Sequence, residues 1–135
     1  MLRLELFFKV FFMSKIEKFE ELKCWQESRR MVKDIVEICE RNGLVRNYEI
    51  KNQIIGCAVS VMNNIAEGFC RFHKKEFIRF LDFSQASAGE LKSMTYIMLD
   101  LNYINENESE DLQIRIESIR SKVNALIKYL NNRTH

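Results

Sequence analysis

The stretch LQIRIESIRSKVNALIKYL, residues 112–130, decides the fold of this 135-residue chain. Its apolar side chains recur every three or four residues, at Leu112, Ile116, Ile119, Val123, Leu126, Ile127 and Leu130. This spacing places them on one stripe of an α-helix, because a helix turns once in about 3.6 residues. A helix with a single apolar stripe buries that stripe against other helices. The stretch therefore predicts one helix, over residues 109–130, of a helical bundle.

Three further helices are predicted upstream by the same spacing of apolar residues. We expect them over residues 20–41, 50–69 and 74–101. Gly43 is expected to cap the first helix, Gly68 to help end the second, and Ser109 to cap the fourth. Zero prolines leave little to interrupt these helices. Because long helices joined by short loops pack as antiparallel neighbours, the sequence predicts an all-α fold, an antiparallel up-down-up-down four-helix bundle.

The chain is long enough for one domain, which we place at residues 19–131, followed by a tail over 132–135. Residues 1–18 form an apolar N-terminal extension, with four phenylalanines among the first twelve residues. It lacks a cleavage site and is too short to span a membrane. Since Met13-Ser14-Lys15 resembles a translation start, we expect either a misassigned upstream start or a disordered arm. We expect no membrane association.

The net charge of +2 is small, but the charges are segregated along the chain. Residues 71–79 carry four basic side chains against one acidic, and residues 113–133 carry five against one. Residues 100–111 carry five acidic side chains and no basic one. In the predicted topology the turn at 71–79 and the end of the fourth helix share one end of the bundle. We therefore expect a bundle with a basic end and an acidic end.

A basic end can neutralise nucleic-acid phosphates, and Phe72 with His73 can add stacking on bases. The candidate nucleic-acid-binding residues are Arg71, His73, Lys74, Lys75, Arg79, Lys122 and Lys128. The same pattern also fits an ordinary solvated surface, or head-to-tail contacts between copies. Charge segregation by itself leaves these alternatives open.

The sequence offers no residues for catalysis, a cofactor or a metal centre. The two histidines are His73, in a loop, and His135, at the terminus. Neither histidine follows a glutamate by three residues, so a Glu-x-x-His metal core is excluded. Neither lies in a predicted interior, so a Ser-His-Asp triad would lack its histidine. Cys70 and His73 would need further ligands from elsewhere to hold a metal. The four cysteines are 15, 18 and 13 residues apart and are predicted to be reduced thiols of a cytoplasmic protein.

The polar residues of the second helix are interpreted as a structural network. Asn64 and Glu67 lie close to the predicted buried stripe, where polar groups need partners. We expect Glu67 to pair with Arg71 and Asn64 to bond to the third helix or to a neighbouring subunit. A ligand or nucleic-acid site is the alternative. The third helix carries an apolar arc broader than one seam requires, so its second face is expected to bind a partner.

The residues resemble the four-helix bundle proteins encoded in bacterial 23S ribosomal RNA intervening sequences. The motifs that carry the resemblance are FEEL at 19–22 with Trp25-Gln26, Gln53, SVMNNIAEG at 60–68, Arg71, Phe77, Phe80-Leu81 and 87–91. The resemblance implies a ring-like homopentamer without established enzymatic activity. It assigns a structural signature to Gln53, Ser60, Asn64, Glu67, Gly68 and Glu90.

The chain is similar as well to the accessory variability proteins of diversity-generating retroelements. That similarity implies a basic pentamer that binds nucleic acid and a reverse transcriptase. Two positions depart from the family pattern. Ile55-Gly56 stands where a basic pair is usual, and Met62 stands where proline is usual. The first change removes charge from the expected nucleic-acid surface, and the second makes a helix kink less expected.

Together these observations predict a cytoplasmic, non-enzymatic homo-oligomer, a pentamer, that binds RNA or DNA through its basic end. The alternative is a protein-interaction scaffold that docks partners on the third helix and binds no nucleic acid. Salt separates the two, because phosphate contacts weaken steeply as salt rises and apolar contacts do not.

Overall fold

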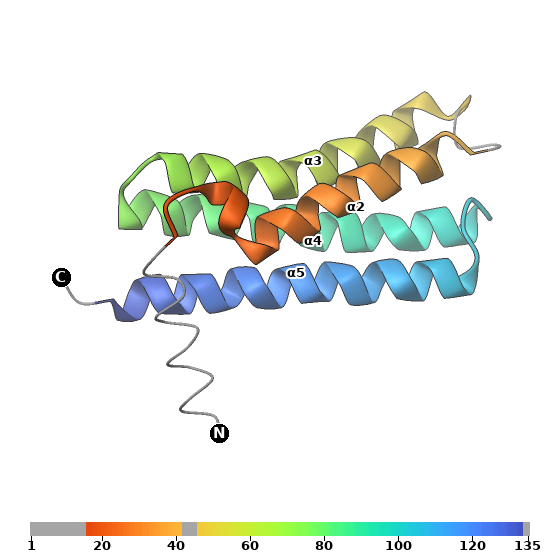
Figure 1. Ribbon diagram of the computed structural model, residues 1–135. Helices are drawn as coiled ribbons and strands as arrows, with labels where there is room; N and C mark the ends of the chain where they lie inside the picture. Colours follow the sequence, from red (N-terminus) through yellow and green to blue (C-terminus); the bar gives the residue numbers. More distant parts are fainter. Residues whose placement is uncertain (1–15, 42–45, 134–135) are drawn as a thin grey trace, which may run out of the picture.

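The computed structural model describes residues 16–41 and 46–133 and contains one short 3-10 turn and four long α-helices (Figure 1). These elements are η1 (Phe19–Glu21), α2 (Lys23–Cys39), α3 (Tyr48–Cys70), α4 (Lys74–Asp100) and α5 (Glu106–Asn132). The described residues include no β-strand. The predicted all-α fold is confirmed.

The helices alternate in direction along the bundle, which gives the predicted up-down-up-down topology (Figure 1). The start of α2, the α3–α4 turn and the end of α5 lie at one end of the molecule. The Lys74 side chain at the start of α4 donates to the Arg133 carbonyl beyond α5, at 3.4 Å. The end of α2, the start of α3 and the α4–α5 connection lie at the opposite end.

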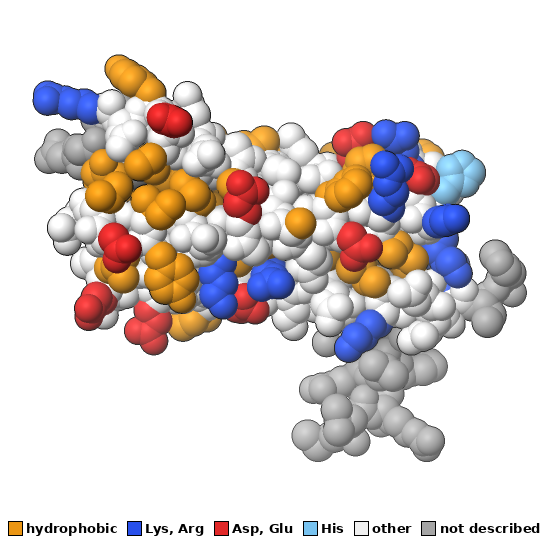
Figure 2. Space-filling model, turned by 180° about the vertical axis from the view of Figure 1, so that it is seen from behind, with side chains coloured by type: hydrophobic (Ala, Val, Ile, Leu, Met, Phe, Trp, Pro, Cys, Tyr) orange, Lys and Arg blue, Asp and Glu red, His pale blue; other side chains and the backbone are white. Residues whose placement is uncertain are grey.

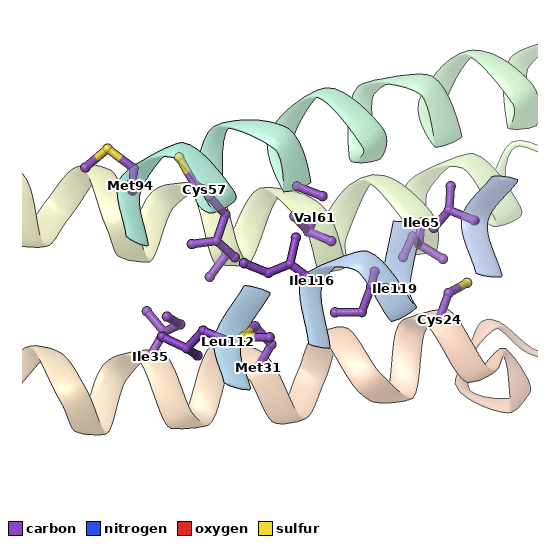
Figure 3. Close-up of a cluster of buried hydrophobic side chains, with 14 of the residues drawn as sticks. Cys24, Met31, Ile35, Cys57, Val61, Ile65, Met94, Leu112, Ile116 and Ile119 are labelled. Atoms are coloured by element: carbon purple, nitrogen blue, oxygen red, sulfur yellow. The ribbon is translucent and has the colours of Figure 1, made fainter. Parts of the chain in front are cut away.

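The apolar stripe of α5 faces the hydrophobic core that the four helices share. The stripe residues Leu112, Ile116, Ile119, Val123, Leu126 and Leu130 are buried, and Ile127 lies partly buried at the margin. Figure 3 shows α5 side chains packed between those of α2, such as Met31 and Ile35, and those of α3, such as Val61 and Ile65. Four amphipathic helices thus share one hydrophobic core.

The predicted start of the last helix is wrong by one turn. α5 begins at Glu106, and Asn105 is its N-cap. The Asn105 side chain accepts from the Glu108 N–H at 2.8 Å, while the Asn105 N–H donates to the Glu108 carboxylate at 3.2 Å. This capping box satisfies two N–H groups that the first helical turn leaves without partners. Ser109 therefore lies buried inside the helix and does not cap it.

Two other predicted boundaries change. The first predicted helix is interrupted at Leu22, whose extended backbone separates the η1 turn from α2. The second does not end at Gly68, because α3 continues through this buried glycine to Cys70. The predicted Gly43 cap lies outside the described residues, as do the extension before Ile16 and the final residues 134–135.

The cysteines divide into three buried thiols and one exposed thiol. Cys24, Cys39 and Cys57 are buried and Cys70 is exposed, and all four are free. Burial raises the pKa of Cys24 to about 12 and the pKa of Cys57 to about 11, where the nearby Glu90 carboxylate adds to the rise. The buried three are therefore protonated at neutral pH and serve as small core side chains.

Candidate nucleic-acid interface

The α3–α4 turn brings four of the predicted binding residues together. Arg71, His73, Lys74 and Lys75 follow one another through the turn and are all exposed. Lys128, on the last turns of α5, is exposed at the same end of the bundle. In Figure 2, blue side chains gather around the histidine at one end, whereas several red ones gather at the opposite end. The predicted charge segregation is thus visible on the folded surface.

Lys122 does not belong to this end. Its ammonium group lies 3.0 Å from the Glu27 carboxylate of α2 and donates to the Ser118 hydroxyl at 2.8 Å. It lies about 15 Å along the helix axis before the end of α5, since each residue adds about 1.5 Å. Lys122 therefore ties α5 to α2 on the side of the bundle. Lys122 is not part of the candidate interface.

Two other basic residues of α5 also have ion-pair partners along the bundle. Arg115 contacts Asp34 of α2 at 2.6 Å, and Arg120 contacts Glu117 of its own helix at 3.0 Å. The acidic partner of Arg115 lies in a distant helix, which sequence spacing alone cannot show. Of the five basic residues at 113–133, only Lys128 and Arg133 therefore lie at the basic end.

Within the described residues, the cations of the α3–α4 turn and the end of α5 fall into two groups. Arg71 pairs with Glu67 at 2.9 Å and Arg79 pairs with Glu76 at 3.3 Å, both as exposed pairs. Such pairs are weak and dissociate readily in favour of a stronger anion. The second group has no ion-pair partner in the described part of the chain and consists of Lys74, Lys75, Lys128 and Arg133. These four positive charges are available to a polyanion.

The N-terminal turn and the start of α2 add acidic residues to the same end, together with the exposed Lys18 and Lys23. Among them, the Glu21 carboxylate accepts from the N–H groups of Glu17 and Lys18, at 2.9 and 3.2 Å. These two hydrogen bonds lower the pKa of Glu21 and hold its charge against its own backbone. The α3–α4 turn and the end of α5 therefore carry the larger excess of basic side chains at this end.

A hollow of about 470 Å³ opens between the α3–α4 turn and the end of α5. It is lined by Gly68, Phe69, Phe72, His73, Lys74, Phe77, Leu130 and Arg133. Phe69 and Phe77 meet edge to face inside it, with ring centroids 5.8 Å apart and planes at 89°. The hollow thus combines aromatic walls with positively charged side chains. Its location was not predicted, because it depends on how α5 ends against the turn.

Phe72 lies on the rim of this hollow with an unusual backbone. Its φ of 57° is in the left-handed region, and its side chain is 86% exposed. This position after a helix usually carries glycine, and a bulky residue there costs about 1–2 kcal/mol. Asn102, after α4, adopts a similar φ of 61°, but asparagine tolerates that conformation well. Phe72 is therefore strained and makes little compensating contact with the core.

Two arginines beside the turn lie over aromatic rings of α4. The Arg71 guanidinium carbon is 4.9 Å from the ring centre of Phe80. The Arg79 guanidinium carbon is 5.9 Å from the same centre and 5.4 Å from that of Phe83. These cation–π contacts orient both guanidinium groups along the outer face of the α3–α4 pair. Phe83 itself remains 42% exposed on that face.

Most of the signature residues lie on the outer side of the α3–α4 seam rather than in the core. Gln53, Glu67 and Glu90 are exposed, whereas Ser60 and Asn64 are half-buried. The predicted Glu67–Arg71 pair is confirmed at 2.9 Å, but Glu67 is not near the core, since half of its side chain is exposed. The sequence placed Glu67 too close to the buried stripe.

The predicted bond from Asn64 to the neighbouring helix is replaced by an indirect one. Asn64 donates to the carbonyl and hydroxyl oxygens of Ser60, at 2.8 and 3.0 Å. The Ser60 hydroxyl in turn contacts the Ser87 hydroxyl of α4 at 2.7 Å. Ser84 of α4 also donates to the Val61 carbonyl at 2.8 Å. Small hydroxyl side chains therefore join α3 to α4 and satisfy one another.

Gly68 has a packing role that sequence analysis missed. A Cβ atom added there would lie 2.8 Å from Phe80 Cβ and 2.9 Å from Phe77 Cδ2. Real Cβ atoms do not approach other atoms this closely, so only glycine allows α3 and the start of α4 to come together. The signal in the sequence was the pairing of Gly68 with two phenylalanines spaced three apart. Gly68 thereby shapes the floor of the hollow.

The described residues show no group of three or more His, Cys, Asp or Glu placed to hold a metal ion. A second hollow, of about 380 Å³, lies between α2 and α5. Its charged walls include the Arg41–Glu108 and Arg115–Asp34 ion pairs, and within each pair the two opposite charges neutralise one another. No helix in the described part of the chain is both long enough and apolar enough to cross a membrane.

The fold and its basic turn define an all-α four-helix bundle protein with one positively charged end. Residues 20–125 match the model of the 23S rRNA-intervening sequence protein family, and the chain belongs to that family. The resemblance noted in the sequence is thereby confirmed. No curated protein matches the sequence significantly.

Among solved structures, the chain is similar to a protein of unknown function from the S23 ribosomal protein family of Bacteroides thetaiotaomicron. The two share 20% identity with a TM-score of 0.70, and the match covers 78% of this chain and 95% of the other. At this identity the likeness shows a shared fold. Neither the family description nor this neighbour indicates an enzymatic activity.

Proposed function

We propose that this protein is a non-enzymatic, cytoplasmic homo-oligomer that binds RNA or DNA through its basic end. One observation carries the proposal. Lys74, Lys75, Lys128 and Arg133 converge at that end, and none has an ion-pair partner in the described residues. The free thiols of the structure support a reducing compartment such as the cytoplasm.

The physical basis of binding is release of counterions from the nucleic acid. If the four unpaired cations each neutralise one phosphate of a single strand, a plot of log Kd against the logarithm of the salt concentration has a slope of about 3. Raising salt from about 50 to 200 mM then weakens binding by about 50-fold for a single chain. Dissociation of the exposed Arg71–Glu67 and Arg79–Glu76 pairs would add two further cations and a steeper slope.

The test is fluorescence anisotropy of a labelled RNA titrated with protein at low and high salt. We compare Lys74→Glu with Lys75→Glu, made together, against a double variant with the same charge change on α2, Arg30→Glu with Lys33→Glu. All four positions are exposed, but only the first pair lies at the basic end. We expect the first variant to lose at least ~10-fold in affinity and the second to stay close to wild type. Equal losses in both would refute binding at the basic end.

We propose further that the outer face of the α3–α4 pair joins copies of the chain. Phe83 and Ile97 of α4 and Leu101, which caps its end, are 42%, 38% and 46% exposed. Their spacing places them on one face of the helix, next to Ser87, whose hydroxyl contacts Ser60 of α3. The exposed signature residues Gln53, Glu67 and Glu90 flank the same seam. An apolar strip with polar margins is typical of protein interfaces. The pentamer implied by the family resemblance is the expected assembly.

Light scattering tests this assembly. A pentamer has five times the chain mass of 16.1 kDa. We expect Ile97→Asp to reduce the mass, and Ile114→Asp, at an isoleucine of α5 that is 62% exposed, to leave it unchanged. A wild-type monomer would refute the proposal. The same apolar strip favours a second candidate function, docking of a different protein, which salt would not weaken and which predicts no RNA binding.

A further inference from the structure

The basic end also carries a specific feature, the aromatic hollow beside the turn, and the following inference rests on the proposed function. We propose that the hollow binds an unpaired nucleobase of single-stranded nucleic acid, with Phe72 stacking on the base. The protein would then prefer single strands and loops to duplexes. The inference combines three features: an exposed ring, an aromatic floor and a cationic rim.

The exposed ring is that of Phe72. It is 86% exposed at the rim, and its left-handed backbone directs it out of the turn rather than into the core. A ring in this position offers a face on which a base can stack, and such stacking tolerates any base because every base has a π-face. The strain of the left-handed conformation is the kind that folded proteins retain mostly at functional positions.

The aromatic floor is rigid. Phe69 of α3 and Phe77 of α4 hold each other edge to face at 5.8 Å, and both are half-buried against the core. Gly68 allows this close approach, since a Cβ there would lie 2.9 Å from Phe77. The floor is therefore fixed before a ligand arrives, which reduces the entropy lost on binding. The volume of about 470 Å³ is within the range of sites for small organic groups.

The cationic rim identifies the ligand as a nucleotide rather than an apolar group. Lys74 and Arg133 both line the hollow, and the Lys74 ammonium group donates to the Arg133 carbonyl oxygen at 3.4 Å. Neither side chain has an ion-pair partner in the described residues. A base within the hollow would have its own phosphates beside these cations. In a duplex the base is paired and stacked inside the helix, so it reaches the hollow only after extrusion, which costs free energy.

The experiment compares three ligands by anisotropy at low salt: a short oligoadenylate, an RNA duplex of equal length, and polyphosphate. Polyphosphate offers charge without bases. A second readout is the fluorescence of an oligoadenylate that carries 2-aminopurine, which is quenched when the base stacks. The variants are Phe72→Gly, Phe72→Asn and Phe72→Trp, each first checked for native helicity by circular dichroism. Glycine and asparagine both suit the left-handed backbone, so at least one variant without the ring should fold.

We expect wild type and Phe72→Trp to bind the single strand more tightly than the duplex and to quench 2-aminopurine. Phe72→Gly and Phe72→Asn should lose roughly 5-fold or more in single-strand affinity and lose the quenching, while polyphosphate binding stays unchanged. Equal affinity for both RNAs in all variants, without quenching, would overturn the base-stacking site while leaving the phosphate-binding proposal intact. If wild type bound none of the three ligands, the proposed function itself would fail.

Discussion

Gly68→Ala tests how closely α3 approaches the start of α4. The new Cβ would lie 2.8 Å from Phe80 Cβ, 2.9 Å from Phe77 Cδ2 and 3.2 Å from the Phe77 carbonyl oxygen. Two of these atoms belong to or adjoin the backbone of α4, so a side-chain rotation cannot relieve the overlap. The helix must move, and overpacking of this kind costs about 1–3 kcal/mol.

The opposing term is the helix propensity of alanine, which exceeds that of glycine by about 1 kcal/mol. We therefore expect Gly68→Ala to lower the free energy of unfolding by up to about 2 kcal/mol. Gly56→Ala is the matched control, because it changes the same residue type in the same helix with no atom within 4 Å of the new Cβ. Only the propensity term remains there, so the control should gain about 0.5–1 kcal/mol.

Urea unfolding followed by circular dichroism measures both changes by linear extrapolation, at one protein concentration so that assembly contributes equally. The two variants should differ by the overpacking cost of about 1–3 kcal/mol, with similar dependence on urea. If Gly68→Ala were as stable as Gly56→Ala, the close crossing of α3 and α4 would be wrong. The shape of the aromatic hollow would then be wrong as well, since Phe77 forms its floor.

Three further predictions concern the turn, the cap and the thiols. Phe72→Asn should raise the free energy of unfolding by about 0.5–1 kcal/mol, because asparagine relieves the left-handed strain; a loss of stability would show that the ring packs on the fold. Asn105→Ala should cost about 1 kcal/mol in urea unfolding by removing the cap of α5, whereas an unchanged midpoint would place the cap elsewhere. In thiol labelling of the native protein, Cys70 should react first. Cys24, whose pKa burial raises to about 12, should stay unreactive as pH rises through the ordinary thiol range; early labelling would contradict its burial.

The fold could be predicted because each helix carries its own apolar stripe, and the stripe at 112–130 is buried almost completely. The start of α5 was predicted less well, because Ser109 and Asn105 are both residue types that cap helices. Only Asn105 is followed three residues later by a glutamate, which completes a capping box. The role of Lys122 could not be predicted. Its partner Glu27 lies in the first helix of the bundle, and the contact exists only because α2 and α5 close the bundle side by side.

The candidate site was predicted in part. The run from Arg71 to Lys75 is continuous in sequence, so its clustering needed only the α3–α4 turn. The hollow needed more, because Leu130 and Arg133 reach it from a helix about sixty residues away and Gly68 acts through contacts made by Phe77 and Phe80. Neither the left-handed backbone of Phe72 nor the depth of the hollow has a signal in residue spacing.

The segregation of charge along the bundle has a consequence for any ring of identical chains. Closed rotational symmetry about an axis along the bundles would place every basic end on one face of the ring and every acidic end on the other. A single strand of nucleic acid lying across the basic face would then meet several copies of Lys74 and Arg133 in succession. Each further contact would be intramolecular and would gain from a high effective concentration. Modest affinity in one chain would become strong avidity in the ring, and short oligonucleotides would bind far more weakly than long ones.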